Sequence, residues 1–336
     1  MHLKEEKIML FKQQSGFTLI EMLVSMVIGL FLLGGVFTIY LSSVRTGQVV
    51  DNEVQLMRDA QFALETIAFD LRHAGNYGHA NHEGQESVRD EEKHTVATGQ
   101  CNGNASGWIV NLNRPVFAVE DGTDYISDCM NKWSQGDTLE LRYASPLPTN
   151  TLESDLDADT LYLKSIPDYS HMFQGDTPPP TRTFQEEDGS TKANIRYFVW
   201  NARAYYIANF TDQAGDGVPS LRLLTLEPGP NVNDTILLRG VEDFQVKLGL
   251  DTPSAGNESG NESADTYVNP GDVGNRWNMV MSARIWLVLR SEKELEETDL
   301  DPSYEVAGVT KTSTDKYRRL VVSTTIRLRN VNTGLK

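Results

Sequence analysis

The chain has 336 residues, of which 39% are hydrophobic and 23% are charged. This length and composition suit one large or two ordinary folded domains. The formal net charge is −17, from 47 acidic and 30 basic residues, and the basic residues occur only in short runs. Such a surface repels the phosphate backbone of nucleic acids, so we expect no nucleic-acid partner.

An almost wholly apolar segment runs from Phe17 to Leu41, with Glu21 as its one charged residue. Its 25 residues would form a helix about 37 Å long, which is enough to cross a hydrocarbon core of about 30 Å. Three lysines and two glutamates precede the segment, so the positive charge on that side is modest. This bias favours an N-terminus in the cytoplasm, with the residues after Leu41 on the other side of the membrane.

The hexapeptide at residues 16–21, GFTLIE, resembles the site that prepilin peptidase cuts in type IV pilins. The resemblance implies that residues 1–16 are a leader ending at Gly16, and that Phe17 is the first mature residue and is then N-methylated. Glycine suits such a site because it leaves the backbone open to a peptidase. An ordinary secretory signal is cut after its apolar core, whereas Gly16 precedes it. A plain signal anchor gives no reason for the hexapeptide.

Glu21 is the residue of the apolar segment that carries the most chemistry. Taken alone, it is a carboxylate at the membrane edge that reaches for lipid headgroups. A lone charge within a membrane span usually has a partner, however, and the pilin resemblance implies that Glu21 meets the N-terminal amine of a neighbouring subunit. Both groups would cost several kcal/mol if they were buried unpaired, so we hypothesise that Glu21 guides filament assembly.

The helical pattern continues beyond the membrane segment, because no proline occurs between Phe17 and Asn76. Apolar residues recur at helical spacing at Val50, Val54, Met57, Leu64, Ala68 and Leu71. We therefore predict one helix from Phe17 to about His73. Its first half, residues 17–41, is transmembrane. Its amphipathic second half, residues 42–75, packs on a head domain, because an exposed apolar stripe needs a cover.

Residues 76–336 change to short alternating runs that are typical of β-strands. The predicted strands are residues 107–112, 138–144, 160–166, 195–200, 203–210, 220–226, 243–250, 279–290 and 318–329. The last alternates apolar with polar residues, which indicates a half-buried antiparallel strand. The sequence thus predicts a large β-rich periplasmic head, with flexible insertions near 177–182 and 252–274.

Four further segments resemble the PilW family of minor pilins: residues 67–75 (IAFDLRHAG), 239–244 (RGVEDF), 283–289 (ARIWLVL) and 325–330 (TIRLRN). The resemblance implies an α+β type IV pilin fold, in which a long N-terminal membrane and spine helix packs on a mostly antiparallel β head. It also implies a minor pilin that helps to initiate the type IV pilus and sits near its tip. A J-type minor pseudopilin of type II secretion shares this architecture and stays an alternative, as does a recognition or adhesion module.

The same resemblance sets the expected partners and location. Prepilin peptidase, the major and other minor pilins and the pilus assembly platform are the expected protein partners, and the tip position leaves room for an adhesin. The chain would sit in the inner membrane before assembly and in the pilus afterwards, with roles in cell adhesion and twitching motility.

The sequence contains two cysteines, Cys101 and Cys129, without the CxxC spacing of a zinc site. In an exported domain two cysteines are more often paired than free, and this loop closure would stabilise the fold by about 3–4 kcal/mol. The alternative is two separate buried thiols. Because the N-terminus indicates export, we expect a disulfide.

No HExxH, GxSxG, P-loop or GxGxxG motif occurs, so we expect no catalytic residues, no cofactor and no enzymatic activity. His79 and His82 are three residues apart, but we interpret them as solvent-exposed loop histidines. Two acidic groups are weak calcium candidates: Asp155, Asp157 and Asp159, and Asp212 with Asp216. The first lacks the glycine and the final glutamate of an EF-hand loop, so we interpret both as solvated turns.

Overall fold

The computed structural model describes residues 16–78, 106–111, 114–122, 129–149, 152–166, 169–178, 195–229, 231–252, 263–294 and 302–331. The chain divides into two compact units, Met1–Val54 and Gln55–Lys336. The described part of the first unit, from Leu19 onward, is helical.

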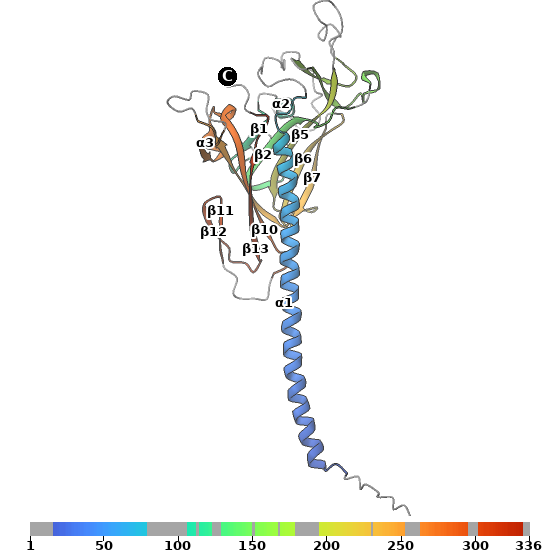
Figure 1. Ribbon diagram of the computed structural model, residues 1–336, viewed down its shortest axis with the longest axis vertical. Helices are drawn as coiled ribbons and strands as arrows, with labels where there is room; N and C mark the ends of the chain where they lie inside the picture. The colour runs from blue at the N-terminus through green and yellow to red at the C-terminus, as the bar shows by residue number, and fades with distance from the viewer. Residues whose placement is uncertain are drawn as a thin grey trace, which may run out of the picture. The chain divides into compact units, whose positions relative to one another are not determined.

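Helix α1 (Leu19–His73) is continuous over 55 residues (Figure 1), as the lack of proline predicted. Its start differs from the predicted Phe17 by two residues, because Thr18 forms the first hydrogen bonds of the helix from outside it. Within it, an 18-residue window reaches a mean hydropathy of 2.4, and none of that window is buried. By length and composition α1 is able to cross a membrane.

In the second unit the buried face of α1 differs from the predicted stripe by about one residue. The buried apolar side chains are Leu56, Ala60, Ala63, Ile67, Ala68 and Leu71. The predicted Met57 is 50% exposed. The three alanines explain the difference, because small side chains allow a helix backbone to approach a sheet closely, and a stripe drawn through the largest apolar residues overlooks them.

The strands form three antiparallel sheets in the described part of the chain. The seven-stranded sheet has the order β1-β2-β5-β3-β4, and β6 pairs with β5 and β7. Its members are β1 (Val116–Val119), β2 (Trp133–Ala144), β3 (Leu161–Ile166), β4 (Tyr169–Gln174), β5 (Arg196–Ala208), β6 (Ser220–Glu227) and β7 (Asn231–Arg239).

The four-stranded sheet has the order β13-β10-β8-β9, and β11 pairs with β12 as a separate hairpin. These strands are β8 (Val241–Leu250), β9 (Thr266–Val268), β10 (Val280–Arg290), β11 (Ser303–Val306), β12 (Val309–Thr312) and β13 (Arg319–Arg327). Short helices occur at α2 (Ser106–Val110) and α3 (Pro270–Val273), with single 3-10 turns at Glu153–Asp155 and Trp277–Met279. The mostly antiparallel β head is thus confirmed.

The main core lies where α1 and both larger sheets bring their apolar side chains together. Strand alternation supplies these side chains: Leu139, Leu141, Tyr205, Ile207, Val246, Leu248, Ile285 and Leu287 are all at most 1% exposed. The alternate residues of β5, among them Ala202, Ala204 and Tyr206, belong to a second cluster with Trp108 of α2. β5 is therefore buried on both faces. Each large apolar side chain buried in this way contributes about 1.5–3 kcal/mol.

Three of the predicted strands differ from the observed elements. Most of the predicted strand at 107–112 is helical instead, because residues 106–110 form the short helix α2, in which the adjacent Trp108 and Ile109 are both buried. The predicted strands at 195–200 and 203–210 are one 13-residue strand, β5, which passes through Asn201 without a turn. The predicted half-buried antiparallel strand at the end of the chain is confirmed as β13, paired with β10.

Candidate functional site

The predicted processing site lies at the start of the described chain. Gly16, Phe17 and Thr18 precede α1 and are exposed. The Glu21 backbone N–H donates a 3.4 Å hydrogen bond to the Thr18 hydroxyl oxygen, and the Met22 N–H donates a 3.2 Å bond to the Thr18 carbonyl oxygen. Thr18 therefore caps the helix, and Glu21 occupies the third position, where a carboxylate is favoured by the helix dipole.

The fold of this chain does not itself require glycine at position 16. A Cβ atom placed on Gly16 would meet no other atom within 4 Å. The same holds for Gly29, Gly34 and Gly35 inside α1, where each glycine costs about 1 kcal/mol of helix stability relative to alanine. Contacts with another molecule would account for these glycines. An enzyme that binds the backbone at Gly16 and a closely packed neighbouring helix at the other three are such contacts.

A buried carboxylate connects α1 to the seven-stranded sheet. Asp70 of α1 is 0% exposed. It accepts hydrogen bonds from the Tyr143 hydroxyl (2.6 Å) and the Tyr205 hydroxyl, and it forms a 3.1 Å ion pair with Arg203. Burial raises the pKa of Tyr205 well above its usual range, and the charge of Asp70 raises it further, so this tyrosine stays a hydrogen-bond donor.

A second set of contacts fixes the end of α1. Gly75 follows the helix with φ = +78°, a conformation that favours glycine, and a Cβ there would lie 2.5 Å from the Asn330 carbonyl oxygen. The Gly75 N–H donates to the Arg142 carbonyl oxygen at 3.0 Å. The Asn330 side chain donates to the Arg72 carbonyl oxygen at 3.1 Å. The helix end is therefore held by both β2 and the chain that follows β13.

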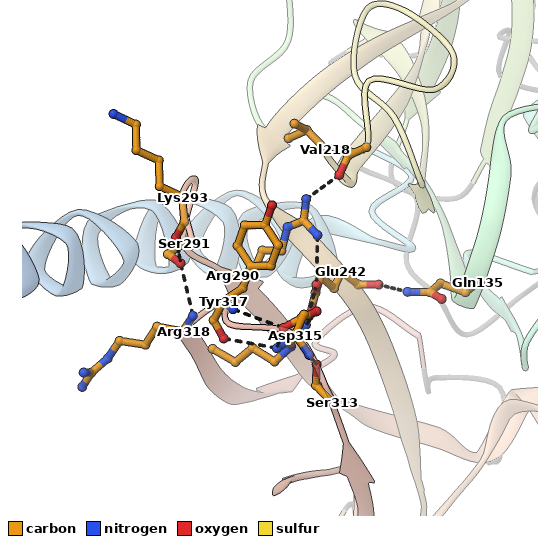
Figure 2. Close-up of polar contacts among 12 residues, drawn as sticks. Gln135, Val218, Glu242, Arg290, Ser291, Lys293, Ser313, Asp315, Tyr317 and Arg318 are labelled. Carbon is orange, nitrogen blue, oxygen red and sulfur yellow. Dashed lines mark hydrogen bonds and ion pairs between the residues drawn. The ribbon is translucent and has the colours of Figure 1, made fainter. Parts of the chain in front are cut away.

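A cluster of charged side chains fixes the four-stranded sheet to its loops (Figure 2). Arg319 of β13 forms a bidentate pair with Glu242 of β8 at 2.6 and 3.0 Å, and a second with Asp315 at 2.6 and 2.7 Å. Arg290 lies 3.5 Å from Glu242 and packs 4.2 Å from the centre of the Tyr317 ring. The cluster thus joins β8, β10 and β13 to the loop before β13. Because each of these four charged groups is paired with another, we interpret the cluster as a stabilising contact and not as a binding site.

Gly240 allows the backbone to turn sharply before Glu242. The residue has φ = +78°, and a Cβ there would lie 3.0 Å from the Arg290 carbonyl oxygen. Its N–H donates to the Pro219 carbonyl oxygen at 2.7 Å, and the Arg290 N–H donates to the Gly240 carbonyl oxygen at 2.8 Å. At this residue the chain leaves β7 of the seven-stranded sheet and enters β8 of the four-stranded sheet.

The predicted cysteine and histidine sites are only partly described. Cys129 is disulfide-bonded and 9% exposed. Cys101, the other cysteine of the sequence, lies outside the described residues, so the pairing of Cys101 with Cys129 stays a prediction. His79 and His82 also lie outside the described residues.

The acidic groups that were weak calcium candidates make local turn contacts. The Asp157 carboxylate accepts a 3.0 Å bond from the Asp159 N–H. Asp216 accepts bonds from the N–H groups of Thr211 at 3.0 Å and Val218 at 2.9 Å. Asp212 forms a 2.6 Å ion pair with Arg239, and the Ser154 hydroxyl donates to Asp155 at 3.1 Å. Within the described residues, no three His, Cys, Asp or Glu side chains converge as metal ligands.

The contacts of Asp70 with β2 and β5 are not among the features that the sequence predicted. A signal was available, because Asp70 falls between Ile67 and Leu71, on the face of α1 that the head buries. An acidic residue on a buried helical face requires partners. Their identity was not readable, because Tyr143 and Tyr205 follow Asp70 by 73 and 135 residues.

Comparison with known proteins gives two family matches. Residues 204–330 match the family described as Type IV Pilus-assembly protein W, abbreviated PilW. Residues 11–37 match the Prokaryotic N-terminal methylation motif, which includes Gly16, Phe17 and Glu21. No curated protein matches the chain. Among solved structures, a type IV-like pilin from Thermus thermophilus matches over 68% of this chain and 94% of that one, with 11% identity and a TM-score of 0.27.

The first family match covers β6, β7, β8, β10 and β13 together with the Glu242 cluster and Gly240. The methylation motif and the apolar part of α1 indicate membrane anchoring and a place in the pilus. A pilus-assembly family indicates a structural, non-enzymatic protein that interacts with other pilins and the pilus machinery. The two matches together support a type IV minor pilin of the PilW family.

Proposed function

We propose that this minor pilin helps to initiate the pilus and takes a position near its tip. The observation that carries the proposal is the apolar surface of α1 in the first unit. Phe31, Leu33 and Phe37 of α1 are 81%, 68% and 62% exposed. Such a surface needs lipid before assembly and the apolar helices of other pilins afterwards.

In this proposal the chain is made as a precursor in the inner membrane, with its N-terminus in the cytoplasm and its head in the periplasm. Prepilin peptidase cuts between Gly16 and Phe17, and the new amine of Phe17 is methylated. The exposed, non-helical residues 16–18 support this step, because a peptidase binds an extended backbone more readily than a helical one. The partners are then the assembly platform, the major pilin, other minor pilins and a tip adhesin.

Glu21 would direct the entry of the subunit into the filament. Its carboxylate is exposed and forms no hydrogen bond or ion pair with any described residue. Surrounded by apolar side chains from Ile20 to Val24, it would be costly to bury alone. The N-terminal amine of Phe17 on a neighbouring subunit is a cation that would offset this cost.

The test combines processing with assembly. N-terminal sequencing of the membrane-extracted protein should give methylated Phe17, and a product that still begins at Met1 would overturn the proposed cleavage. Glu21→Ala should be processed normally but should be depleted from sheared pili by about tenfold or more. Asp51→Ala, on the same helix outside the apolar segment, is the matched control. Wild-type recovery of Glu21→Ala in pili would refute the role of this carboxylate.

The tip position has its own readout. Immunogold labelling of the head should mark pilus ends, and deletion of the gene should reduce the number of pili rather than their length. Labelling along the whole shaft would contradict the tip position while leaving the processing and Glu21 results intact.

A further inference from the structure

Two phenylalanines of α1 in the second unit lie outside the helix face that the head buries. Phe62 and Phe69 are 54% and 46% exposed. They are one heptad apart in the sequence, so they lie on one line along the helix, about 10 Å from each other. Exposed aromatic side chains at this spacing indicate a helix face that packs against another helix.

An apolar groove lies on another flank of the same helical turns. It has a volume of about 320 Å³, and its walls are α1 and β13. Its lining includes Met57, Ala60, Gln61 and Leu64 of α1, and Val322 of β13. The four residues of α1 have the i, i+3, i+4, i+7 spacing of a hole that receives one side chain from a facing helix. Because the alanine is small, this hole has room for a large side chain.

The outer rim of the groove carries charges of alternating sign. Glu65 and Arg72 line the groove, and the exposed Arg58 comes one heptad before Glu65 on the same line of the helix. Glu65 accepts a 2.8 Å hydrogen bond from the Gln61 amide through one of its oxygens. Within the residues that the structure describes, neither arginine forms an ion pair. Both are therefore available to a carboxylate of another molecule.

We propose that the groove between α1 and β13 receives Phe69 from a second copy of this chain. The two α1 helices would be parallel, because both copies would carry their apolar segments in the same membrane. Phe69 of the second copy would lie opposite the centre of the hole formed by residues 57, 60, 61 and 64. This requires an axial shift of about eight to nine residues, or about 13 Å, between the copies.

The rim charges favour this register. With the shift, Arg72 of the second copy comes level with Glu65 of the first, and Glu65 of the second comes level with Arg58 of the first. Both contacts join opposite charges. Without the shift Phe62 would enter the hole instead, but each charged side chain would then come level with its own counterpart and repel it.

The contact is head-to-tail, because Phe69 and the groove are different surfaces of one chain. Each pair of copies keeps one free groove and one free Phe69, so further copies add with the same axial shift and no closed dimer forms. The inference goes beyond the proposed function, because it concerns the second unit and a contact between copies. It is independent of Glu21 and of cleavage at Gly16.

Photo-crosslinking between two tagged forms of the full chain, made in the same cells, tests the contact. The donor copy carries the photoreactive amino acid p-benzoylphenylalanine in place of Phe69, and the receiving copy carries a different epitope tag. Irradiation should give an adduct with both tags, in which the receiving copy is modified between Met57 and Leu64 or at Val322. With the photoreactive group in place of Phe62, the modified position should move about one heptad toward the N-terminus of α1. In place of Val309, which is 57% exposed on β12, it should give no adduct with both tags.

A substitution in only one copy tests the direction of the contact. Met57→Glu puts a charge at the groove, at a position that is 50% exposed. In the receiving copy it should lower the yield of the Phe69 adduct by about fivefold or more, whereas in the donor copy the yield should stay within about twofold. Met57→Leu in the receiving copy is the matched control and should also stay within about twofold.

Charge reversal tests the register. Glu65→Arg in both copies should lower the yield of the adduct by about fivefold, because it places like charges level with each other. Addition of Arg58→Glu and Arg72→Glu to both copies restores the alternation with opposite sign, so the yield should return to within about twofold of the wild-type value.

Three results would overturn the proposal. They are the lack of an adduct with both tags from either phenylalanine position, an equal effect of Met57→Glu in the two copies, and failure of the triple charge reversal to restore the yield. An adduct that joins the Phe69 position to a different protein, in place of the second copy, would overturn the stated occupant.

Discussion

The hydroxyl group of Tyr143 on β2 donates a 2.6 Å hydrogen bond to the carboxylate of Asp70 on α1, and the two residues are 1% and 0% exposed. Both residues are buried, so the loss of either partner would leave a polar group without a hydrogen bond inside the head. Arg203 and Tyr205 of β5 complete the set. The second half of α1 is thus held to the seven-stranded sheet by polar as well as apolar contacts.

Asp70→Asn should destabilise the second unit. The substitution removes the charge that pairs with Arg203. It also replaces one acceptor oxygen by an NH2 group, which then faces a tyrosine hydroxyl that had donated its hydrogen bond to that oxygen. We expect a loss of about 2–4 kcal/mol, which corresponds to a fall in melting temperature of at least about 4 °C. Glu65→Gln removes a charge in the same way at an exposed position of α1 and should change the melting temperature little. Equal effects of the two variants would show that the Asp70 contacts contribute nothing specific.

Gly75→Ala should also be strongly destabilising, for two separable reasons. The left-handed backbone costs about 1 kcal/mol for alanine, and the new Cβ would collide with the Asn330 carbonyl oxygen at 2.5 Å. Gly215→Ala is the matched control, because Gly215 has φ = +90° with no atom within 4 Å of a Cβ. Thermal melts should show a loss at Gly75 that exceeds the loss at Gly215 by more than about 1 kcal/mol. A loss no larger than that at Gly215 would mean that the contact with Asn330 yields easily.

The stability of the head should fall as pH rises from about 5 to about 8. Burial raises the pKa of Asp137 to about 7, although N–H groups of Val246 and Asp121 favour its charged form. Burial likewise raises the pKa of Glu140 to about 7, opposed by the charge of Arg142. Both groups bind their protons more tightly when folded than when unfolded. The stability that they contribute is therefore complete below about pH 4 and is lost as pH rises through about 7.

Melting temperatures measured in matched buffers test this pH dependence. Each pKa unit corresponds to about 1.4 kcal/mol, so the two groups together should lower the free energy of unfolding by a few kcal/mol across the range. Asp137→Asn does not titrate and should give a shallower slope, whatever its absolute stability. A melting temperature that is flat or that rises between pH 5 and pH 8 would contradict the assignment.

Arg319→Lys should loosen the junction between β13 and the loop that precedes it. The guanidinium group of Arg319 forms four hydrogen bonds with Glu242 and Asp315, and a single ammonium group cannot reproduce two bidentate pairs. We expect a loss of about 1–3 kcal/mol in a denaturant titration. The control is Arg329→Lys at an exposed position, where the change should be within about 0.5 kcal/mol. An Arg319→Lys variant as stable as this control would show that the cluster does not hold the loop.

Local patterns in the sequence predicted the elements that such patterns determine. The proline-free run to Asn76 predicted α1, and strict alternation at residues 318–329 predicted β13. The GFTLIE hexapeptide predicted the match to the methylation motif, because the chemistry of that site depends on adjacent residues.

Contacts between distant residues were not predictable in this way. Nothing near Asp70 indicates Tyr143 or Arg203, because their meeting depends on how β2 and β5 are placed by the whole sheet. The alternating pattern at residues 107–112 also led to a wrong strand prediction, because Trp108 and Ile109 are neighbours in a short helix and are both buried. Short polar strands such as β11 and β12 carry too few apolar residues for any period to be seen.

The burial of α1 residues in the second unit decides where the protein can be cut. Ala60, Ala63 and Ile67 are at most 1% exposed, so a fragment that begins at Asn76 would have an open interior and would not fold. A protease acting near Val54 would instead release a body whose interior is complete. Helix α1 therefore supplies both the apolar membrane segment and part of the core of the head. A cut that separates the membrane segment from an intact head must lie before Leu56.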